Sequence, residues 1–397
     1  MAWLFNTFLF LSSFIVVLSV LVFIHEMGHY SVARFFKVSI DKFSIGFGKP
    51  IVKRTDKHGT EWVVSRIPFG GFVKFSGDMG MASNPDHEQL AALKEKAEAE
   101  GKEADIGRLF HFKPLWQKAL VVLAGPVANF LLAIVIFAIV VMTYGNRETK
   151  SHVISVASGG AAEAAGVLAG DQFLTMDGHD VRLHRDLSPY VSLRSGSEIK
   201  AVVLRDGREV ELTIEPQRTD RKDFVGGTNK TGIIGVNLGG EGASFQRRYN
   251  AVEAVGYGVN EVGRTISSTG TYIGRIFSGK EDGSALGGPL RIATLTGKTA
   301  VDVAKLDRPL GERLKAGFFT LLQLGAYLSI GLGVANLMPI PVLDGGHLLF
   351  YGYEAVAGRP LSQEKQEIGF RFGFALLLTL FVFLTFNDVG YIRSFFS

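Results

Sequence analysis

The stretch FLFLSSFIVVLSVLVFIHEMGH, residues 8–29, joins a long apolar run to a His-Glu-x-x-His motif. If the run is helical, His25 and His29 stand one turn apart on the same side and can hold one metal ion. Glu26 projects beside them, where it can take a proton from water. Two imidazoles and an oxygen ligand suit zinc. The motif also arises by chance on helices that bind nothing, so a site without metal stays open at this point.

The composition indicates a membrane protein with a polar domain inserted between its spans. Hydrophobic residues make up 47% of the 397 residues, and the mean hydropathy is +0.22. Four stretches are long and apolar enough to cross a bilayer as helices; they lie near residues 4–24, 119–144, 316–338 and 370–386. The absence of cysteine excludes disulfides and thiolate ligands. A net charge of +4 is too slight and too dispersed to indicate nucleic acid as a partner.

The first span, within residues 1–36, carries the metal motif and sets the orientation. No charge precedes it, and basic residues follow it at positions 34, 37, 42, 49, 53, 54 and 57. The positive-inside rule then places the N-terminus outside the cell and the next loop in the cytoplasm. A cleaved signal peptide would need a basic start and a small-residue cleavage site, and neither is present. We therefore expect a retained span.

Residues 37–117 predict a cytoplasmic or membrane-associated β region followed by a charged insert. Two strands within 43–77 flank a turn at Asp56-Lys57-His58-Gly59. They form either an ordinary hairpin or a sheet edge that pairs with an extended substrate. Residues 86–105 indicate a solvated helix or a flexible insert, and His87 within it is not expected to be a ligand.

The second span, residues 118–145, contains Ala-Gly-Pro-Val-Ala-Asn at 124–129, whose small residues favour close helix packing. We expect Asn129 to hydrogen-bond a neighbouring helix rather than to act in catalysis. The polar domain follows at 146–240. The sequence of this domain predicts a strand at 153–156, a short helix at 161–167, a hairpin around Asp206-Gly207 and a closing strand at 232–236. Residues 241–315 indicate amphipathic or linker helices outside the membrane.

The third span, residues 316–348, ends in Asn336-Leu-Met-Pro-Ile-Pro-Val-Leu-Asp344-Gly-Gly-His347. Two prolines break the helix, and the span count places Asp344 on the same side of the membrane as His29. Asp344 then supplies the missing oxygen ligand and leaves a fourth position for water. His347 is a rival ligand by residue type, but a cap or interface role suits it as well. Residues 349–397 predict a cytoplasmic loop and the fourth span.

The paired motifs resemble those of the site-2 protease family of intramembrane metalloproteases, and the chain is similar to its bacterial regulator-of-sigma-E protease group. The order of elements in 146–240 resembles that of a PDZ domain. This chain has one such domain, whereas the best-known members of the group have two in tandem. The resemblance implies zinc bound by His25, His29 and Asp344, with Glu26 as the catalytic base. It also implies that the loop of Gly46, Phe47 and Gly48, the hairpin after it, and Asn336 contact the substrate strand.

The fold expected is thus a polytopic α-helical membrane protein with four transmembrane helices, a cytoplasmic β-hairpin region and an extracytoplasmic PDZ domain. Its expected function is that of a zinc metalloendopeptidase cleaving single-span membrane proteins, such as anti-sigma factors or remnant signal peptides. It would lie in the bacterial inner membrane, with its active site near the cytoplasmic side and a peptide ligand on the PDZ domain. The alternative is a non-catalytic PDZ scaffold with a structural zinc. A transporter fits four spans without paired repeats poorly.

Overall fold

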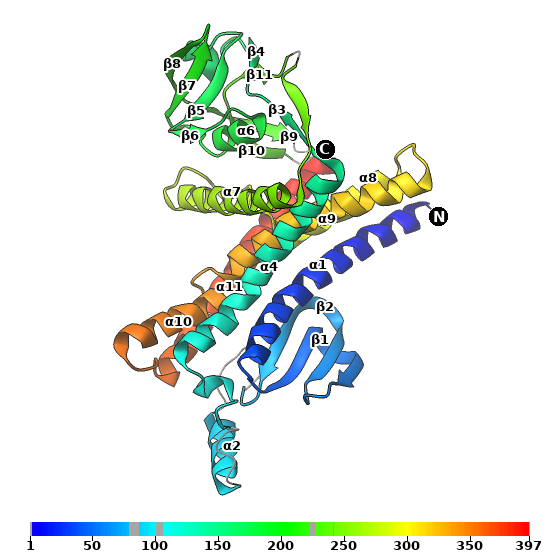
Figure 1. Cartoon of the computed structure of the whole chain (residues 1–397), viewed down its shortest axis with the longest axis vertical. Coiled ribbons are helices and arrows are strands. Elements are labelled where there is room, and N and C mark those ends of the chain that lie inside the picture. The colour runs from blue at the N-terminus through cyan, green and yellow to red at the C-terminus, as the bar shows by residue number, and fades with distance from the viewer. Residues whose placement is uncertain (1, 79–86, 101–105, 223–227, 241, 397) are drawn as a thin grey trace. The chain divides into compact units, whose positions relative to one another are not determined.

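A computed structural model describes residues 2–78, 87–100, 106–222, 228–240 and 242–396 of the chain (Figure 1). The chain divides into two compact units. The first comprises Met1–Ile136 and Thr296–Phe383, and the second comprises Phe137–Leu295 and Leu384–Ser397. The elements of the metal motif, of the β region and of the Asp344 segment all belong to the first unit.

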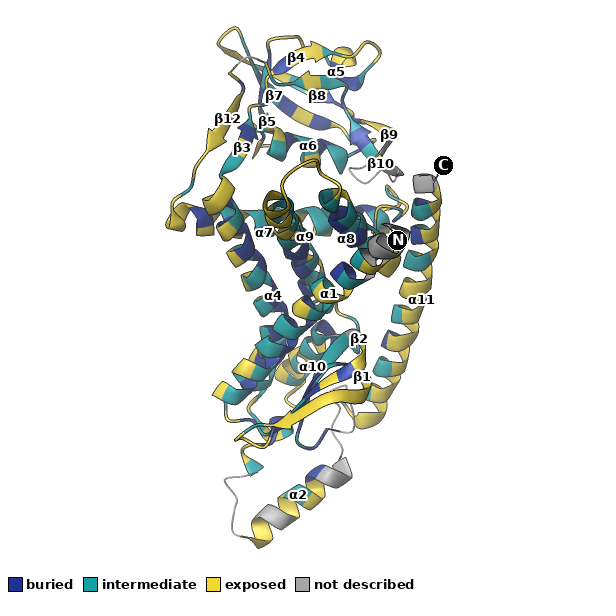
Figure 2. Cartoon of the chain, turned by 90° about the vertical axis from the view of Figure 1, so that its right-hand side faces the viewer, coloured by how far each residue is buried: buried dark blue, intermediate teal, exposed yellow. Residues whose placement is uncertain are grey.

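Four helices in the described ranges are long and apolar enough to cross a membrane, as predicted; these are α1 (Ala2–Phe35), α4 (Leu115–Tyr144), α9 (Leu310–Asn336) and α11 (Gln363–Phe396). Figure 2 shows α11 exposed along most of its length. Many of its exposed side chains are large and apolar, among them Phe372, Phe381 and Phe386. An apolar surface of this length suits contact with lipid rather than water.

Helix α1 continues past the apolar stretch near residues 4–24 and covers most of the segment 1–36 predicted for the first span. The metal motif was expected at the edge of that stretch, and the helix runs on to Phe35. No proline interrupts the segment, and Gly28 is its single glycine, which a helix tolerates. The motif therefore lies inside a continuous helix, which fixes the spacing of His25 and His29 more firmly than a helix terminus would.

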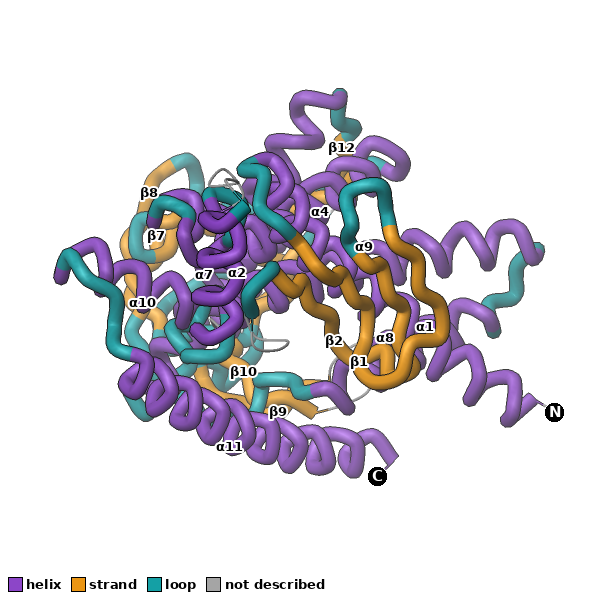
Figure 3. The backbone as a smooth tube through the Cα atoms, turned by 90° about the horizontal axis from the view of Figure 1, so that it is seen from below, coloured by secondary structure: helices purple, strands orange, loops and turns teal. Residues whose placement is uncertain are grey.

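The predicted β region forms two long strands, β1 (Ile40–Thr55) and β2 (Glu61–Phe75), which curve beside α1 (Figure 3). Residues 42–45 of β1 lie between two segments of β2, because they pair with 71–74 on one side and with 61–64 on the other. Glycines with positive φ make this folding possible: Gly46 and Gly48 bend β1, and Gly70 bends β2. Val38, Phe43, Phe75 and Phe110 fill the core against α1.

The rest of the first unit is helical. The charged segment forms α2 (His87–Ala99), and a short 3₁₀ turn, η1 (Phe110–Phe112), precedes α4. Residues expected to form a loop after the third span instead fold as α10 (Asp344–Ala357). Its apolar stretch has helical spacing, and Gly358 ends it in the left-handed conformation.

The second unit carries the polar domain as a set of small sheets. Its central sheet has the order β6-β5-β7-β8, and three further pairs are β4-β11, β9-β10 and β3-β12. The bounds are β3 Asn146–Thr149, β4 Val153–Val156, β5 Gln172–Met176, β6 His179–Asp180, β7 Ile199–Arg205, β8 Arg208–Ile214, β9 Gln217–Lys222, β10 Thr228–Ile233, β11 Val236–Leu238 and β12 Ser244–Arg247. Two helices, α5 (Ala161–Ala164) and α6 (His184–Ser192), complete a core that includes Phe173, Met176 and Ile199.

Most elements predicted for this domain are present. The hairpin turns at Asp206 and Gly207, both with positive φ, as an Asp-Gly turn requires. The single closing strand predicted for 232–236 is wrong: β10 ends at Ile233 and β11 begins at Val236. Gly235 has a φ of +77° and turns the chain between them. Helices α7 (Ala251–Phe277) and α8 (Pro289–Ala304) follow, α7 beginning with a capping box of Asn250 and Glu253.

Candidate metal centre

Two histidines of α1 and the first residue of α10 come together in the first unit. The Nε2 atom of His25 lies 3.2 Å from Oδ2 of Asp344, and the Nε2 atom of His29 lies 3.5 Å from it. The two Nε2 atoms are 3.2 Å apart. One donor atom from each residue fits within a span of 4.8 Å. Three such atoms converging on one point can hold a metal ion, with a further position left open.

The chemistry of these atoms also fits a cation. Oδ2 of Asp344 is buried and accepts no well-aligned hydrogen bond from the described part of the chain. Its neighbours are the imidazole nitrogens of His25 and His29. A buried carboxylate oxygen without a donor is costly unless a charge compensates it. This set of donors, two imidazoles and one carboxylate, is typical of catalytic zinc sites.

Helix α4 provides the wall of the centre. The carbonyl of Val121 accepts a hydrogen bond from Nδ1–H of His29 over 2.9 Å, which leaves Nε2 of that ring free to bind a metal. The side chain of Asn129, fully buried, lies 3.1 Å from Nδ1 of His25. This contact agrees with the expectation that Asn129 bonds to a neighbouring helix, although the neighbour proves to be the metal motif itself.

Two glycines allow α1 and α4 to approach this closely. A Cβ at Gly28 would stand 2.8 Å from the Cβ of Ala128, and one at Gly125 would stand 2.9 Å from the Cε1 atom of His25. Both distances are shorter than Cβ contacts found in proteins. Small residues therefore bring the backbone of α4 against the histidines, as is usual where helices pack in lipid.

The loop before Asp344 is tightly held. A Cβ at Gly345 would stand 2.5 Å from the carbonyl carbon of Leu337, and one at Gly346 would stand 2.6 Å from Cα of Pro341. Helix α11 closes the other side, because a Cβ at Gly373 would stand 2.8 Å from the carbonyl carbon of Pro341. Val342 has a φ of +98°, a conformation that β-branched residues avoid. Such strain persists only where the surroundings fix the backbone, and here it precedes the Asp344 segment.

Glu26 faces the β region rather than open solvent. It is buried, and the backbone amide of Val73 faces its carboxylate. A Cβ at Gly71 would stand 3.1 Å from Cγ of Glu26, so the β2 backbone lies directly against this side chain. A strand that bordered β2 here would run past Glu26.

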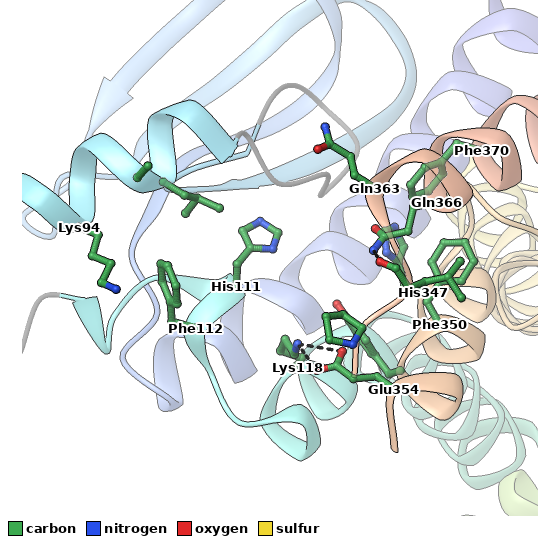
Figure 4. A pocket seen from close by; sticks show the side chains of 15 residues that line it. Lys94, His111, Phe112, Lys118, His347, Phe350, Glu354, Gln363, Gln366 and Phe370 are labelled. Carbon is green, nitrogen blue, oxygen red and sulfur yellow. Dashed lines mark hydrogen bonds and ion pairs between the residues drawn. The ribbon is translucent and has the colours of Figure 1, made fainter. Parts of the chain in front are cut away.

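His347, the rival ligand, is not part of the cluster of donor atoms. Its ring lies 5.7 Å from that of Phe370 and lines a cavity of about 470 Å³ together with Lys118, Phe350 and Glu354 (Figure 4). Its position at this cavity, beside Phe370, indicates an interface role.

The residues predicted to contact substrate lie in two places. Asn336 ends α9, and its amide donates to the carbonyl of Leu332 over 3.0 Å. Gly46, Phe47 and Gly48 form the bend of β1, where the ring of Phe47 stacks on that of Phe72. Their role in substrate binding stays a prediction, as do the roles of His25, His29, Asp344 and Glu26.

The sequence did not predict three features of the site. They are the hydrogen bond from His29 to the carbonyl of Val121, the close approach of the backbone at Gly125, and the contact of the Asn129 side chain with His25. A backbone carbonyl carries no signal in the sequence. The run Ala124–Asn129 did carry one, because a buried amide between small residues in an apolar span needs a polar partner.

The family model described as "Peptidase family M50" matches residues 13–380 of the chain. The chain belongs to peptidase family M50. It is 40% identical to Metalloprotease MmpA of Caulobacter vibrioides, over 96% of this chain and 95% of that protein. It is 42% identical to a Mesorhizobium japonicum protein named "Putative zinc metalloprotease", over 95% of this chain and 97% of the relative. The Rhizobium meliloti protein of the same description is 40% identical, over 96% of each chain.

Family membership confirms the expected class of enzyme. This M50 peptidase is an intramembrane zinc metalloprotease, and its four apolar helices agree with a membrane location.

Proposed function

We propose that this peptidase cleaves single-span membrane proteins within or at the edge of the bilayer, with His25, His29 and Asp344 holding the zinc ion and Glu26 as general base. The convergence of these three side chains within 4.8 Å, beside a buried glutamate, carries the proposal. Bound zinc would polarise the scissile carbonyl and make water a stronger nucleophile near neutral pH.

The protein's own residues account for the remaining steps. Glu26 takes the proton of the attacking water and later passes it to the leaving amine. The amide of Val73 faces its carboxylate, which holds it in place. Asp344 would balance the charge of a bound metal, and the strained loop that ends at Leu343 precedes it.

A transmembrane substrate must unwind before it can be cut, because helical hydrogen bonds occupy its carbonyls. Apart from the Val73 amide, which faces Glu26, the segment 71–74 of β2 can supply replacement partners. It pairs with 42–45 on one side, and no strand in the described part of the chain pairs with its other side. An unwound substrate added to this edge would pass Gly71 and Glu26. The bend at Gly46, Phe47 and Gly48, together with Asn336, would contact the same strand.

Cleavage of a single-span substrate by purified protein tests the chemistry. Glu26→Gln should abolish cleavage and retain zinc, and Glu364→Gln, an exposed acid at the start of α11, should retain both. Zinc in the wild type with no cleavage of several substrates would support the scaffold alternative. A Glu26→Gln variant that cleaves at the wild-type rate would exclude Glu26 as the base.

We further propose that residues 146–240 form a PDZ domain that selects substrates outside the cell. A cavity of about 530 Å³ lies between α6 and residues 232–238, with Leu187 and Val191 on the helix side. An extended peptide could enter it beside the edge of β11. The basic residues that follow α1 favour a cytoplasmic metal centre, and hence an extracytoplasmic N-terminus and domain. The substrates would include anti-sigma factors or remnant signal peptides.

A bulky substitution distinguishes selection from a structural role. Ser188→Trp would fill the cavity, whereas Glu209→Trp places the same side chain on an exposed strand position. We expect the first variant alone to change which of a panel of substrates is cleaved, with zinc content unaffected. An identical panel for both variants would make the domain a structural plug.

A further inference from the structure

Asn129 carries a buried amide that is only partly hydrogen-bonded by the residues that the structure describes. It lies on α4 within an apolar span and is fully buried. Its Nδ2 atom is 3.1 Å from Nδ1 of His25. Its Oδ1 atom is buried and has no partner among the residues that the structure describes. An unpaired buried acceptor of this kind costs roughly 1–3 kcal/mol.

The orientation of the amide decides which nitrogen of His25 carries a proton. If the Nδ2 group donates to Nδ1, a neutral His25 must carry its proton on Nε2 and cannot bind a metal through that atom. A half-turn of the amide about its last bond exchanges oxygen and nitrogen without changing its shape. Oδ1 then accepts from Nδ1–H, and the lone pair on Nε2 faces Asp344.

His29 already has the second arrangement. The carbonyl of Val121 accepts from its Nδ1–H, and its Nε2 atom faces Asp344. Turning the Asn129 amide gives both histidines the same tautomer and gives Oδ1 a donor, while Nδ2 takes the position that has no partner among the residues that the structure describes. The backbone of Asn129 is fixed from a third helix, because the hydroxyl of Ser329 on α9 donates to its carbonyl over 2.9 Å.

We propose that Asn129 is a positioning residue that accepts a hydrogen bond from Nδ1–H of His25 and so selects the tautomer that binds zinc through Nε2. The amide is thus the counterpart on α4 of the Val121 carbonyl. Acceptors of this type orient ligating histidines, and their loss typically lowers metal affinity by about 10–100-fold. The inference rests on the proposed role of His25 as a ligand.

Zinc affinity of the full-length protein in detergent, measured by competition with a chelator, tests the inference without reference to activity. Asn129→Leu keeps the approximate shape but removes the acceptor, and we expect about a 10–100-fold loss of affinity. The ionised carboxylate of Asn129→Asp can only accept, so the zinc affinity of this variant should stay within a few-fold of wild type. Thr143→Val removes a hydroxyl elsewhere on α4 and should change nothing.

Two results would overturn the inference: wild-type affinity in Asn129→Leu, or an Asn129→Asp variant as weak as Asn129→Leu. Thermal unfolding without zinc shows whether Asn129→Leu folds. If it does not fold, Asn129→Asp alone tests the inference. Loss of zinc binding in Asn129→Asp would mean that the wild-type amide donates to Nδ1 of His25 and does not accept from it. His25→Leu separates this inference from the proposed ligand set. Wild-type zinc binding by His25→Leu would refute His25 as a ligand. If His25→Leu loses zinc and Asn129→Leu keeps wild-type affinity, only the role of Asn129 is refuted.

Discussion

Replacing Gly125 by alanine would place a methyl group between the imidazole rings of the metal centre. The ideal Cβ position lies 2.5 Å from Cε1 of His29 and 2.9 Å from Cε1 of His25. Cβ atoms in proteins essentially never come closer than 3.0 Å to another heavy atom. The His29 ring or the α4 backbone must therefore move by at least 0.5 Å, the difference between 3.0 and 2.5 Å.

A shift of that size exceeds what a metal site tolerates, because ligand distances vary by only about 0.2 Å. We expect Gly125→Ala to weaken zinc binding by at least the roughly 10–100-fold that disturbed ligand orientation causes. Overpacking should also lower the free energy of unfolding of the zinc-free protein by about 1–3 kcal/mol. Proteolysis should fall with zinc occupancy.

The assay compares chelator competition and thermal unfolding for wild type, Gly125→Ala and Gly331→Ala. Gly331 lies in α9, and apart from its own helix backbone no heavy atom of the described residues lies within 4 Å of its ideal Cβ, so alanine there tests the general effect of a methyl group in a span. Equal zinc affinity in all three proteins would refute the close approach of α4 to the two histidines, and with it the proposed wall of the site.

Two further predictions concern the loop before Asp344 and the turn between β1 and β2. Gly373→Ala on α11 should push the carbonyl carbon of Pro341, which lies 2.8 Å from the ideal Cβ, and should lower kcat and zinc affinity by displacing Asp344. Gly390→Ala is the control, because no heavy atom of the described residues outside its own helix backbone lies within 4 Å of its ideal Cβ. Equal kcat and zinc affinity in the two variants would mean that α11 does not hold this loop. For Asp56, partial burial raises the pKa, but hydrogen bonds from Trp62 and from the amides of His58 and Thr60 outweigh it and lower the pKa to about 2. The contribution of Asp56 to hairpin stability should be complete above the ordinary pKa of 3.8 and be lost as pH falls towards 2. Amide hydrogen exchange in the hairpin measures this pH dependence of stability. Asp56→Asn should remove the pH dependence.

Much of the candidate metal centre could be predicted because two of its candidate ligands follow a simple periodicity. The i, i+4 spacing of His25 and His29 needs only a helix, and the apolar run supplies one. Counting spans placed Asp344 on the same side of the membrane. The structure brings the three residues together, which agrees with that reasoning, although their role as ligands awaits the measurements above.

Other features could not be predicted because they depend on neighbours distant in the chain. The position of residues 42–45 between two segments of β2 follows from bends at several glycines, each of which alone indicates only a turn. Helix α10 begins at Asp344 directly after two prolines and a strained valine, where local preferences favour a loop. The positive φ of Val342 contradicts its own preference and arises from packing on both sides.

The run from Ala124 to Asn129 gains a single explanation from the geometry. Lipid gives helices no hydrophobic reason to associate, so close packing must come from small residues and polar contacts. Gly125 and Ala128 let α4 reach the histidines. Once the backbones are this close, a carbonyl at 121 and an amide at 129 fall within hydrogen-bonding distance of the two imidazoles. A run first seen as a packing surface thus also orients the candidate ligands, because the same proximity serves both purposes.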